Sequence, residues 1–169
     1  MHTSIFIGLG ANLPHERFGS PRRTLEAALA ELDRKGVRTV RVSPWYRTAP
    51  VPASDQPWYV NAVAEVASDL PADALLAELH AVEAAFGRAR TVPNAARPID
   101  LDLLDYHGEI APSGPGRAIL PHPRMIGRAF VLRPLADLAP DWCHPVTGQP
   151  IGELLAALPA DQMAERITS

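Results

Sequence analysis

The chain of 169 residues contains a single cysteine and a single lysine, and only 6% of its residues are aromatic. Cys143 alone cannot build a disulfide framework or a cysteine-rich zinc module. Lys35 lies in DRKGV and not at the end of a glycine-rich turn, so a P-loop is excluded. There is no apolar run of about 18 residues, and the N-terminus does not have the pattern of a signal peptide. These absences predict a cytoplasmic protein that does not interact with a membrane.

The positive charge that is present comes almost entirely from arginine. All of the 16 basic residues except Lys35 are arginines, and the formal net charge is −3. Because no run of Lys and Arg occurs, we do not expect a nucleic-acid partner. With 47% hydrophobic residues the chain can build one core, so we expect a single domain over residues 1–169.

Hydrophobic periodicity predicts four strands and two helices before a less regular C-terminal part. Ser20 and Pro21 form a typical helix start, and Gly36 is a typical helix stop. The expected order is strand 3–9, helix 21–35, strand 37–42, strand 58–67, helix 71–86 and strand 99–106.

Two adjacent strands in the middle exclude a sheet made only of parallel crossovers. The βαββαβ order is typical of an α+β fold, the ferredoxin-like α/β sandwich, in which one antiparallel sheet carries two packed helices on one face. The other face is then open to a ligand. We expect C-terminal helical additions over 121–140, as a two-part helix broken at Pro134, and over 148–158.

The sharpest chemical feature is the pair Asp100 and Asp102 in the segment IDLDLL. Residues two apart on a strand point to one face, so both carboxylates leave the same face. Two like charges on an apolar strand are unfavourable unless a cation lies between them, and Mg²⁺ prefers carboxylate oxygens. The alternative is the solvated outer face of an edge strand.

A basic loop precedes this strand and favours the metal hypothesis. Arg88, Arg90 and Arg97 lie in the segment RARTVPNAARP. Guanidinium groups bind phosphate oxygens in a bidentate way, so three arginines beside two carboxylates suit a metal–polyphosphate. The alternative is that the arginines only form salt bridges with the two aspartates.

The segment LPHPRMIGRAF contains three further candidates, His122, Arg128 and Phe130. The histidine, held between two prolines, would either donate to a phosphate or cap the helix that follows. Arg128 would either meet phosphate or lie on a solvated face. Phe130 would either stack on a ligand or join the core.

Polar residues of strand 58–67 and of the second helix form another candidate group. Asn61 and Tyr59 share one face of the strand, where an amide and a flat ring could bind a heterocycle beside the segment 48–51. Ordinary half-buried strand positions are the alternative. His80 and Glu83 lie near the end of the second helix, close to the basic loop, or they form a surface pair.

Taken together, these segments resemble the 6-hydroxymethyl-7,8-dihydropterin pyrophosphokinase family of folate biosynthesis, from about residue 4 to residue 155. The resemblance rests on five blocks in the family's order: IGLGANL, YRTAP, DQPWYVNAV, RPIDLDLLDY and LPHPRMIGRAFVLRPL. It implies the ferredoxin-like fold and transfer of the β,γ-pyrophosphoryl group of ATP to the pterin's hydroxyl, with release of AMP. It also implies two Mg²⁺ ions, small-molecule substrates and a monomer.

The resemblance further implies a role for each matching residue. Asp100 and Asp102 match the aspartates that bind the paired Mg²⁺ ions, and Arg88 and Arg97 match arginines of the catalytic loop. The positions implied for ATP are His80, Glu83, Arg90, His122 and Arg128. The positions implied for the pterin are Thr48, Ala49, Val51, Tyr59, Asn61 and Phe130.

The chain departs from the family's pattern in the loop before the aspartate strand. Residues 94–97 read NAAR where family members often have Trp-Gly-Pro-Arg, so the aromatic lid over the pterin is missing at Asn94. Two other functions share the expected fold: a non-catalytic regulatory domain that binds a small ligand, and an RNA-recognition sheet. The first does not need two aspartates beside three arginines. The second needs basic and aromatic strands that neither FIGLG nor IDLDLLDY provides.

Overall fold

The computed structural model describes residues 4–15, 17–50, 54–87, 99–111 and 118–167. The strands are β1 (Ile5–Ala11), β2 (Arg38–Val42), β3 (Tyr46–Thr48), β4 (Tyr59–Ala67), β5 (Asp100–Tyr106) and β6 (Ala164–Arg166). The helices are α1 (Pro21–Arg34), α2 (Ala72–Ala85), η1 (Met125–Gly127, a 3₁₀ turn), α3 (Ala129–Leu138) and α4 (Ile151–Ala156). None of the described helices is long and apolar enough to cross a bilayer.

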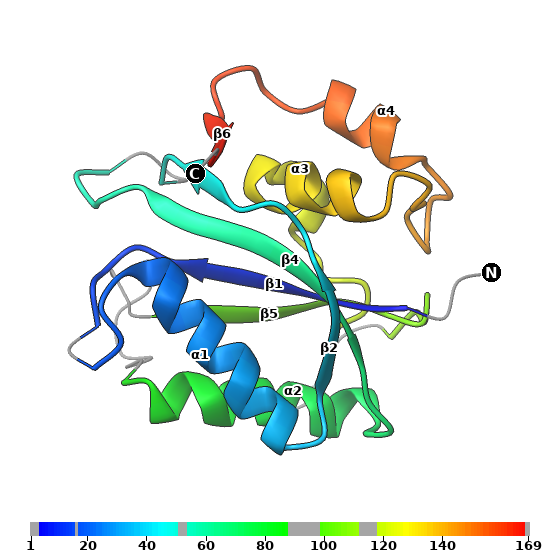
Figure 1. Ribbon diagram of the computed structural model, residues 1–169. Coiled ribbons are helices and arrows are strands. Elements are labelled where there is room, and N and C mark those ends of the chain that lie inside the picture. Colours follow the sequence, from blue (N-terminus) through cyan, green and yellow to red (C-terminus); the bar gives the residue numbers. More distant parts are fainter. Residues whose placement is uncertain (1–3, 16, 51–53, 88–98, 112–117, 168–169) are drawn as a thin grey trace.

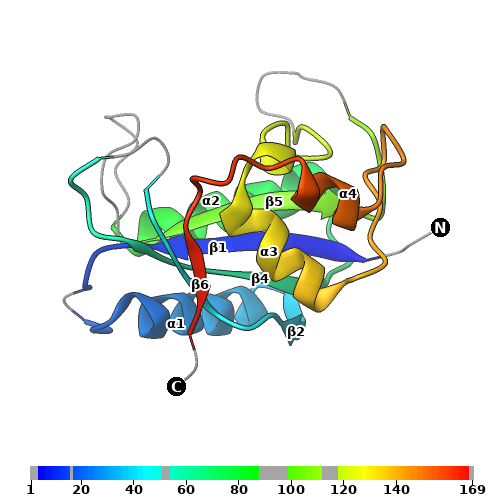
Figure 2. The ribbon, with the colours of Figure 1, turned by 90° about the horizontal axis from the view of Figure 1, so that it is seen from above.

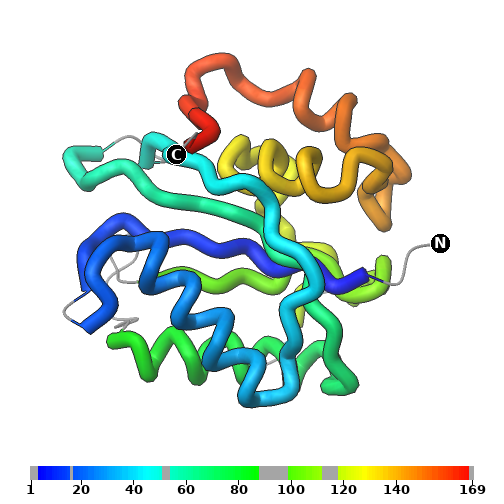
Figure 3. Tube along the Cα trace, in the orientation of Figure 1, coloured from blue at the N-terminus to red at the C-terminus, as the bar shows by residue number. Residues whose placement is uncertain are grey.

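All strands belong to one antiparallel sheet, in the order β5-β1-β4-β3-β6. β2 also pairs with β4, next to its C-terminal half, while β3 pairs with its N-terminal end. The segment 43–45 therefore divides one strand path into two short strands, which Figure 3 shows as a continuous tube alongside β4. The βαββαβ order and the ferredoxin-like fold are confirmed, and β6 is an additional edge strand.

Helices cover both faces of this sheet (Figure 1): α1 and α2 lie on one side, α3 and α4 on the other. β1 contributes side chains to both faces. Ile5, Ile7 and Leu9 belong to the apolar cluster under α1 and α2, and Phe6 belongs to the cluster under α3. The expectation of one open face is therefore wrong for the part of the sheet that α3 covers. Only the rest of that face is left for a ligand.

The expected start and stop of α1 are confirmed. The Ser20 hydroxyl accepts the Arg23 N–H at 3.3 Å and caps the helix, and Gly36 has the positive φ of 85° that ends it. The expected break at Pro134 is wrong, because α3 runs through this residue. The interruption lies instead at Arg128, which is extended between η1 and α3. Proline removes one hydrogen bond from α3, and the burial of the helix's apolar face offsets that loss.

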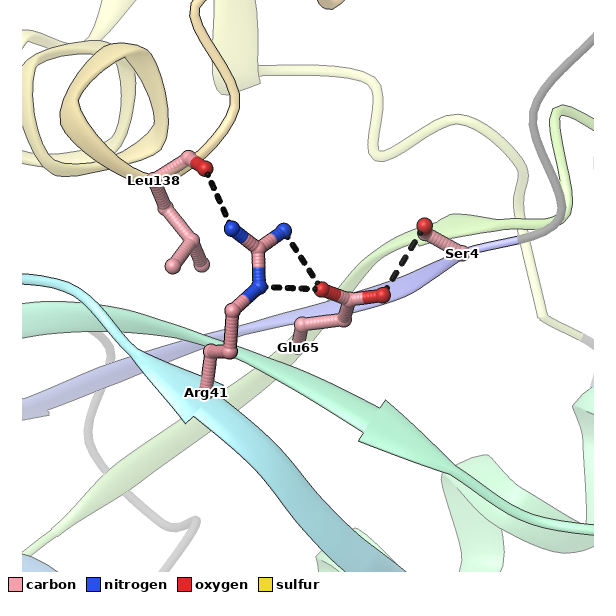
Figure 4. A network of polar contacts seen from close by, with 4 residues as sticks. All are labelled: Ser4, Arg41, Glu65 and Leu138. Carbon is pink, nitrogen blue, oxygen red and sulfur yellow. Dashed lines mark hydrogen bonds and ion pairs between the residues drawn. The ribbon is translucent and has the colours of Figure 1, made fainter.

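The C-terminal end of α3 is tied to the sheet by a polar network (Figure 4). Nε and Nη2 of Arg41 donate to Oε1 of Glu65 at 2.8 and 2.6 Å, and Nη1 donates to the Leu138 carbonyl at 3.1 Å. The Ser4 hydroxyl donates to the other Glu65 oxygen at 3.0 Å. A guanidinium thus satisfies a carbonyl that the end of a helix leaves without a partner in the helix.

Candidate functional site

The two aspartates lie on the described edge strand β5 and face a shallow depression. Asp100 is paired with Gly10 of β1, and Asp102 with Gly8. The depression has an empty space of about 240 Å³, which includes its opening to solvent. It is lined by Gly8, Leu9, Gly10, Asn61, Ala62, Asp100, Asp102, Phe130 and Val131. The structure therefore brings three of the predicted elements together: both aspartates, the strand asparagine and the aromatic residue of α3.

Two glycines of β1 form the floor of this depression between the aspartates and Asn61. A Cβ on Gly10 would lie 2.7 Å from Nδ2 of Asn61, a separation that real side chains essentially never show. A Cβ on Gly8 would meet Leu104 at an ordinary 3.5 Å. Gly10 therefore allows the asparagine amide to approach the strand this closely.

The Asn61 amide is fixed from two neighbouring strands. Its Oδ1 accepts a hydrogen bond from the Thr48 hydroxyl of β3, and its Nδ2 donates to the Leu9 carbonyl of β1 at 3.3 Å. Both side chains are buried. An amide group has two N–H donors and two acceptor sites. These two bonds use one donor and one acceptor site, and they fix the orientation of the second N–H and the second acceptor site. That is the donor and acceptor pair with which the edge of a heterocycle can be read.

Tyr59, two residues before Asn61 on the same face of β4, takes part in a second network. Its hydroxyl donates to Oε1 of Gln56 at 3.5 Å, and the same oxygen accepts from Asn12 at 3.0 Å. Asn12 also donates to the Pro57 carbonyl at 3.3 Å. This network ties the end of β1 to the approach to β4. Ala49, by contrast, uses its N–H for the Met163 carbonyl at 3.1 Å.

His122 is held as a neutral ring beside the start of α3. Burial first, and then the charges of Arg128 and Arg124, lower its pKa to about 4, against a smaller opposing effect of Asp100. Its Nδ1 accepts the Arg124 N–H at 3.2 Å. The hydrogen of the neutral ring is therefore on Nε2, which makes that nitrogen a donor suited to a phosphate oxygen.

Arg128 and Phe130 flank the first residue of α3. The Arg128 guanidinium lies 5.3 Å from the centre of the Phe130 ring, a cation–π distance. Both side chains are half-buried, and Phe130 packs against the apolar cluster under α3 while it also lines the depression. The Phe130 ring is therefore part of the core and also part of the wall of the depression, so the two alternatives hold together.

Glu83 has a position that its sequence pattern does not indicate. It is buried, with 1% of its surface exposed, and its Oε2 accepts the N–H of Leu101 at 2.8 Å. Leu101 is the residue between the two aspartates. A side chain of α2 therefore binds the main chain of the aspartate strand. His80, one turn before, is exposed on α2 and is not among the described residues that line the depression.

The donor set at the depression fits a hard divalent cation in part. No group of three or more His, Cys, Asp or Glu side chains able to hold a metal occurs within the described ranges. One or two carboxylates are the usual protein ligands of Mg²⁺ in nucleotide-dependent enzymes, where waters and substrate phosphates supply the remaining ligands. The residues therefore fit an ion that arrives with a polyphosphate, and not a closed structural site.

Several predicted residues lie outside the part of the chain that the structure describes. They are Val51, Arg88, Arg90, Asn94 and Arg97. Conversely, the sequence interpretation missed the glycine floor and the Gln56 network. Two glycines at alternate positions of one strand were the available signal for a close approach to the backbone. The link between Gln56 and Asn12 has no local signal, because the two residues lie 44 positions apart.

Comparisons with known proteins identify relatives of this chain. Residues 6–140 match the family model described as 7,8-dihydro-6-hydroxymethylpterin-pyrophosphokinase. A 2-amino-4-hydroxy-6-hydroxymethyldihydropteridine pyrophosphokinase of Pseudomonas aeruginosa is 42% identical over 156 residues, which are 92% of this chain and 91% of that protein. A protein of the same name from Methylorubrum extorquens is 38% identical over 92% of this chain and 94% of its own length.

One further relative is much longer. The folic acid synthesis protein fol1 of Pneumocystis carinii is 37% identical over 86% of this chain, and the chain spans only 19% of that protein. The segment that matches the family model, residues 6–140, contains the aspartate strand β5, the asparagine strand β4 and the start of α3. The chain belongs to the 7,8-dihydro-6-hydroxymethylpterin-pyrophosphokinase family.

Proposed function

We propose that the chain transfers the β,γ-pyrophosphoryl group of ATP to the hydroxyl of 6-hydroxymethyl-7,8-dihydropterin, as a step of folate biosynthesis. The observation that carries the proposal is the arrangement of Asp100, Asp102, Asn61 and Phe130 around one depression. A metal–polyphosphate needs the two carboxylates, and a flat heterocycle needs the amide and the ring. Family membership supports the same assignment.

Asp100 and Asp102 would hold the ions, and we propose two Mg²⁺ per active site. Bound there, the metal would neutralise phosphate charge and lower the pKa of the pterin hydroxyl. The neutral His122 would donate from Nε2 to a phosphate oxygen, and Arg128 would add a fixed positive charge. The roles of Arg88, Arg90 and Arg97 on the phosphates, of Val51 beside the pterin and of His80 beside ATP rest on the resemblance alone.

In the reaction, the hydroxymethyl oxygen of the pterin forms a bond to Pβ of ATP. The bond between Pβ and the oxygen that bridges it to Pα breaks, AMP leaves with that oxygen, and the hydroxyl proton is released. The contribution of the chain is positioning and charge neutralisation. Asn61, fixed by Thr48, would orient the pterin, and Phe130 and Tyr59 would form its flat walls. Glu83 would keep the aspartate strand in place.

The experiment measures AMP formation from ATP and Mg²⁺ with and without 6-hydroxymethyl-7,8-dihydropterin. We expect AMP to form only when the pterin is present, and chelation of Mg²⁺ to stop the reaction. A non-catalytic regulatory domain would bind the pterin without forming AMP. ADP with inorganic phosphate would show transfer to water, and ADP without inorganic phosphate would show a single phosphoryl transfer to the pterin; either result would contradict the proposal.

Asp102→Asn tests the metal assignment and keeps the size of the side chain. We expect a loss of kcat of about 10²–10³, because a charge that faces the transition state is removed. Titration with Mn²⁺ in the presence of a non-hydrolysable ATP analogue should give two bound ions for the unaltered chain and weaker binding for the variant. Asp33→Asn, at an exposed position of α1, is the matched control and should leave both readouts unchanged.

We also propose that residues 1–169 act as one domain and as a monomer in the cytosol. The one-domain proposal is supported by β6, which lies after the matched segment and pairs with β3. The monomer rests on the resemblance to the family alone. Light scattering at working concentration is the measurement, and a stable dimer would contradict it.

A further inference from the structure

The turn that carries Arg128 is held by a side chain that comes from 33 residues further along the chain. Oε1 of Gln162 accepts the N–H of Ala129 at 2.8 Å, and its Nε2 donates to the carbonyl of Gly127 at 2.8 Å. One planar amide thus binds the main chain on both sides of Arg128. We call this arrangement the Gln162 clamp.

The clamp satisfies groups that the helix itself leaves without partners. Ala129 is the first residue of α3, and no side-chain hydrogen bond from the N-cap residue Arg128 caps this helix. The first N–H groups of a helix have no partner within the helix. Gln162 therefore provides the cap from a distance. It also fixes the conformation of Arg128, the only residue between η1 and α3, whose φ of −121° and ψ of 111° are extended.

The clamp is itself anchored at the end of β3. The carbonyl of Met163, the next residue, accepts the Ala49 N–H at 3.1 Å, and Ala164 of β6 is paired with Thr48 of β3. Figure 2 shows β6 alongside α3, at the end where the helix begins. The segment 162–164 therefore connects the start of α3 with the end of β3, the strand that fixes Asn61.

We propose that Gln162 is a positioning residue, which holds Arg128 and Phe130 in register with β3 and Asn61. This inference rests on the proposed function, in which Arg128 faces ATP and Phe130 faces the pterin. Gln162 contacts main chain on both sides and acts only through these residues. Without the amide, Gly127 and Ala129 would hydrogen-bond to water, and Arg128 would no longer be confined to one conformation.

Gln162→Met tests the proposal, because methionine keeps the length of the side chain and removes both hydrogen bonds. We expect the KM values for ATP and the pterin to rise about tenfold, a change equivalent to one net hydrogen bond, while kcat changes much less. A merely structural defect would reduce the active fraction, and so the apparent kcat, without a change in KM. Gln149→Met, at an exposed loop position, is the matched control and should behave like the unaltered chain.

Hydrogen exchange at the Ala129 amide is the second readout and does not depend on activity. We expect fast exchange in Gln162→Met, and slow exchange in Gln162→Glu, because the carboxylate still accepts this N–H. Unchanged exchange in Gln162→Met would overturn the clamp, and fast exchange with unchanged KM values would overturn its positioning role. If the unaltered chain forms no pterin-dependent AMP, the proposed function fails, whereas the exchange result still decides whether the clamp exists.

Discussion

At the scale of single residues, Gly10 illustrates how the site depends on an absent side chain. The space above its Cα is taken by the Asn61 amide, which is tied to Thr48 and Leu9. Gly8 faces the same depression, but a methyl group there would make only ordinary contacts. The two glycines therefore form a matched pair that differs in one contact.

Gly10→Ala should push the Asn61 amide away from β1 and cost about 1–3 kcal/mol of stability through overpacking and a lost buried hydrogen bond. Gly8→Ala should cost much less, because its methyl group has room and alanine is less flexible than glycine in the unfolded chain. Urea unfolding of both variants measures the difference. Equal losses would mean that Asn61 adapts without cost.

His122 links the protonation of one ring to the stability of the whole chain. Burial and the nearby Arg128 and Arg124 lower its pKa to about 4, whereas an unfolded histidine titrates near 6.5. Above pH 6.5 the ring is neutral in both states and has no effect. Between pH 6.5 and 4 only the unfolded chain binds the proton, so the folded chain loses stability as the pH falls.

We therefore expect unfolding free energy to fall by about 2 kcal/mol across this window on account of His122, after allowance for partial exposure of the ring. His122→Gln should remove that part of the pH dependence, since glutamine does not titrate. Urea unfolding at pH 7 and pH 5 tests the variant, and NMR titration of the ring tests the cause. A His122 ring that titrates near pH 6.5 in the folded chain would contradict the explanation.

At the scale of the elements, α3 carries residues that line the depression, and side chains from other elements hold both of its ends. Gln162 binds its start, and Arg41, which is itself held by Glu65, donates to the Leu138 carbonyl at its end. The Glu65 side chain is only 16% exposed, so its ion pair with Arg41 is less screened by solvent than a surface pair.

Arg41→Met should cost about 2–3 kcal/mol, because it leaves a largely buried carboxylate and a helix-end carbonyl without their donor. The control is Arg34→Met on α1, whose ion pair with Glu31 at 3.3 Å is exposed and should contribute less than about 0.5 kcal/mol. Urea unfolding at pH 7 compares the two variants. Similar losses in both would show that the Glu65 network stabilises no more than a surface pair.

The sequence was informative for elements whose signal is local. The alternation in IDLDLL predicts that Asp100 and Asp102 share a face, and the structure places both on the depression. β6 has no such signal, because its three residues Ala-Glu-Arg show no apolar alternation. They are held by pairing with β3 and by the ion pair of Arg166 with Asp137 of α3. The course of α3 through Pro134 is likewise decided by burial against the sheet. Glu83 and Gln162 act on main chain 18 and 33 residues away, which no local pattern reports.

At the scale of the whole molecule, the two helical layers share the same strands. Alternate residues of β4 enter different clusters: Ala62 and Ala64 lie under α1 and α2, and Val63 lies under α3. β1 divides its residues in the same way. When the packing on one face of a strand is lost, the register that orders the other face is lost as well. The two clusters should therefore unfold as one cooperative unit.

Leu132→Ala tests this coupling, because Leu132 is fully buried in the cluster under α3. The substitution should cost about 2–5 kcal/mol. We expect native-state hydrogen exchange to show the same loss for the slowest amides of α1, on the opposite face, as for those of α3. Leu79→Ala in the other cluster should in turn lower the protection of α3. If the amides of α1 kept their full protection in Leu132→Ala, α3 and α4 would form a layer that opens on its own. The site residues on α3 could then separate from Asp100 and Asp102 without global unfolding.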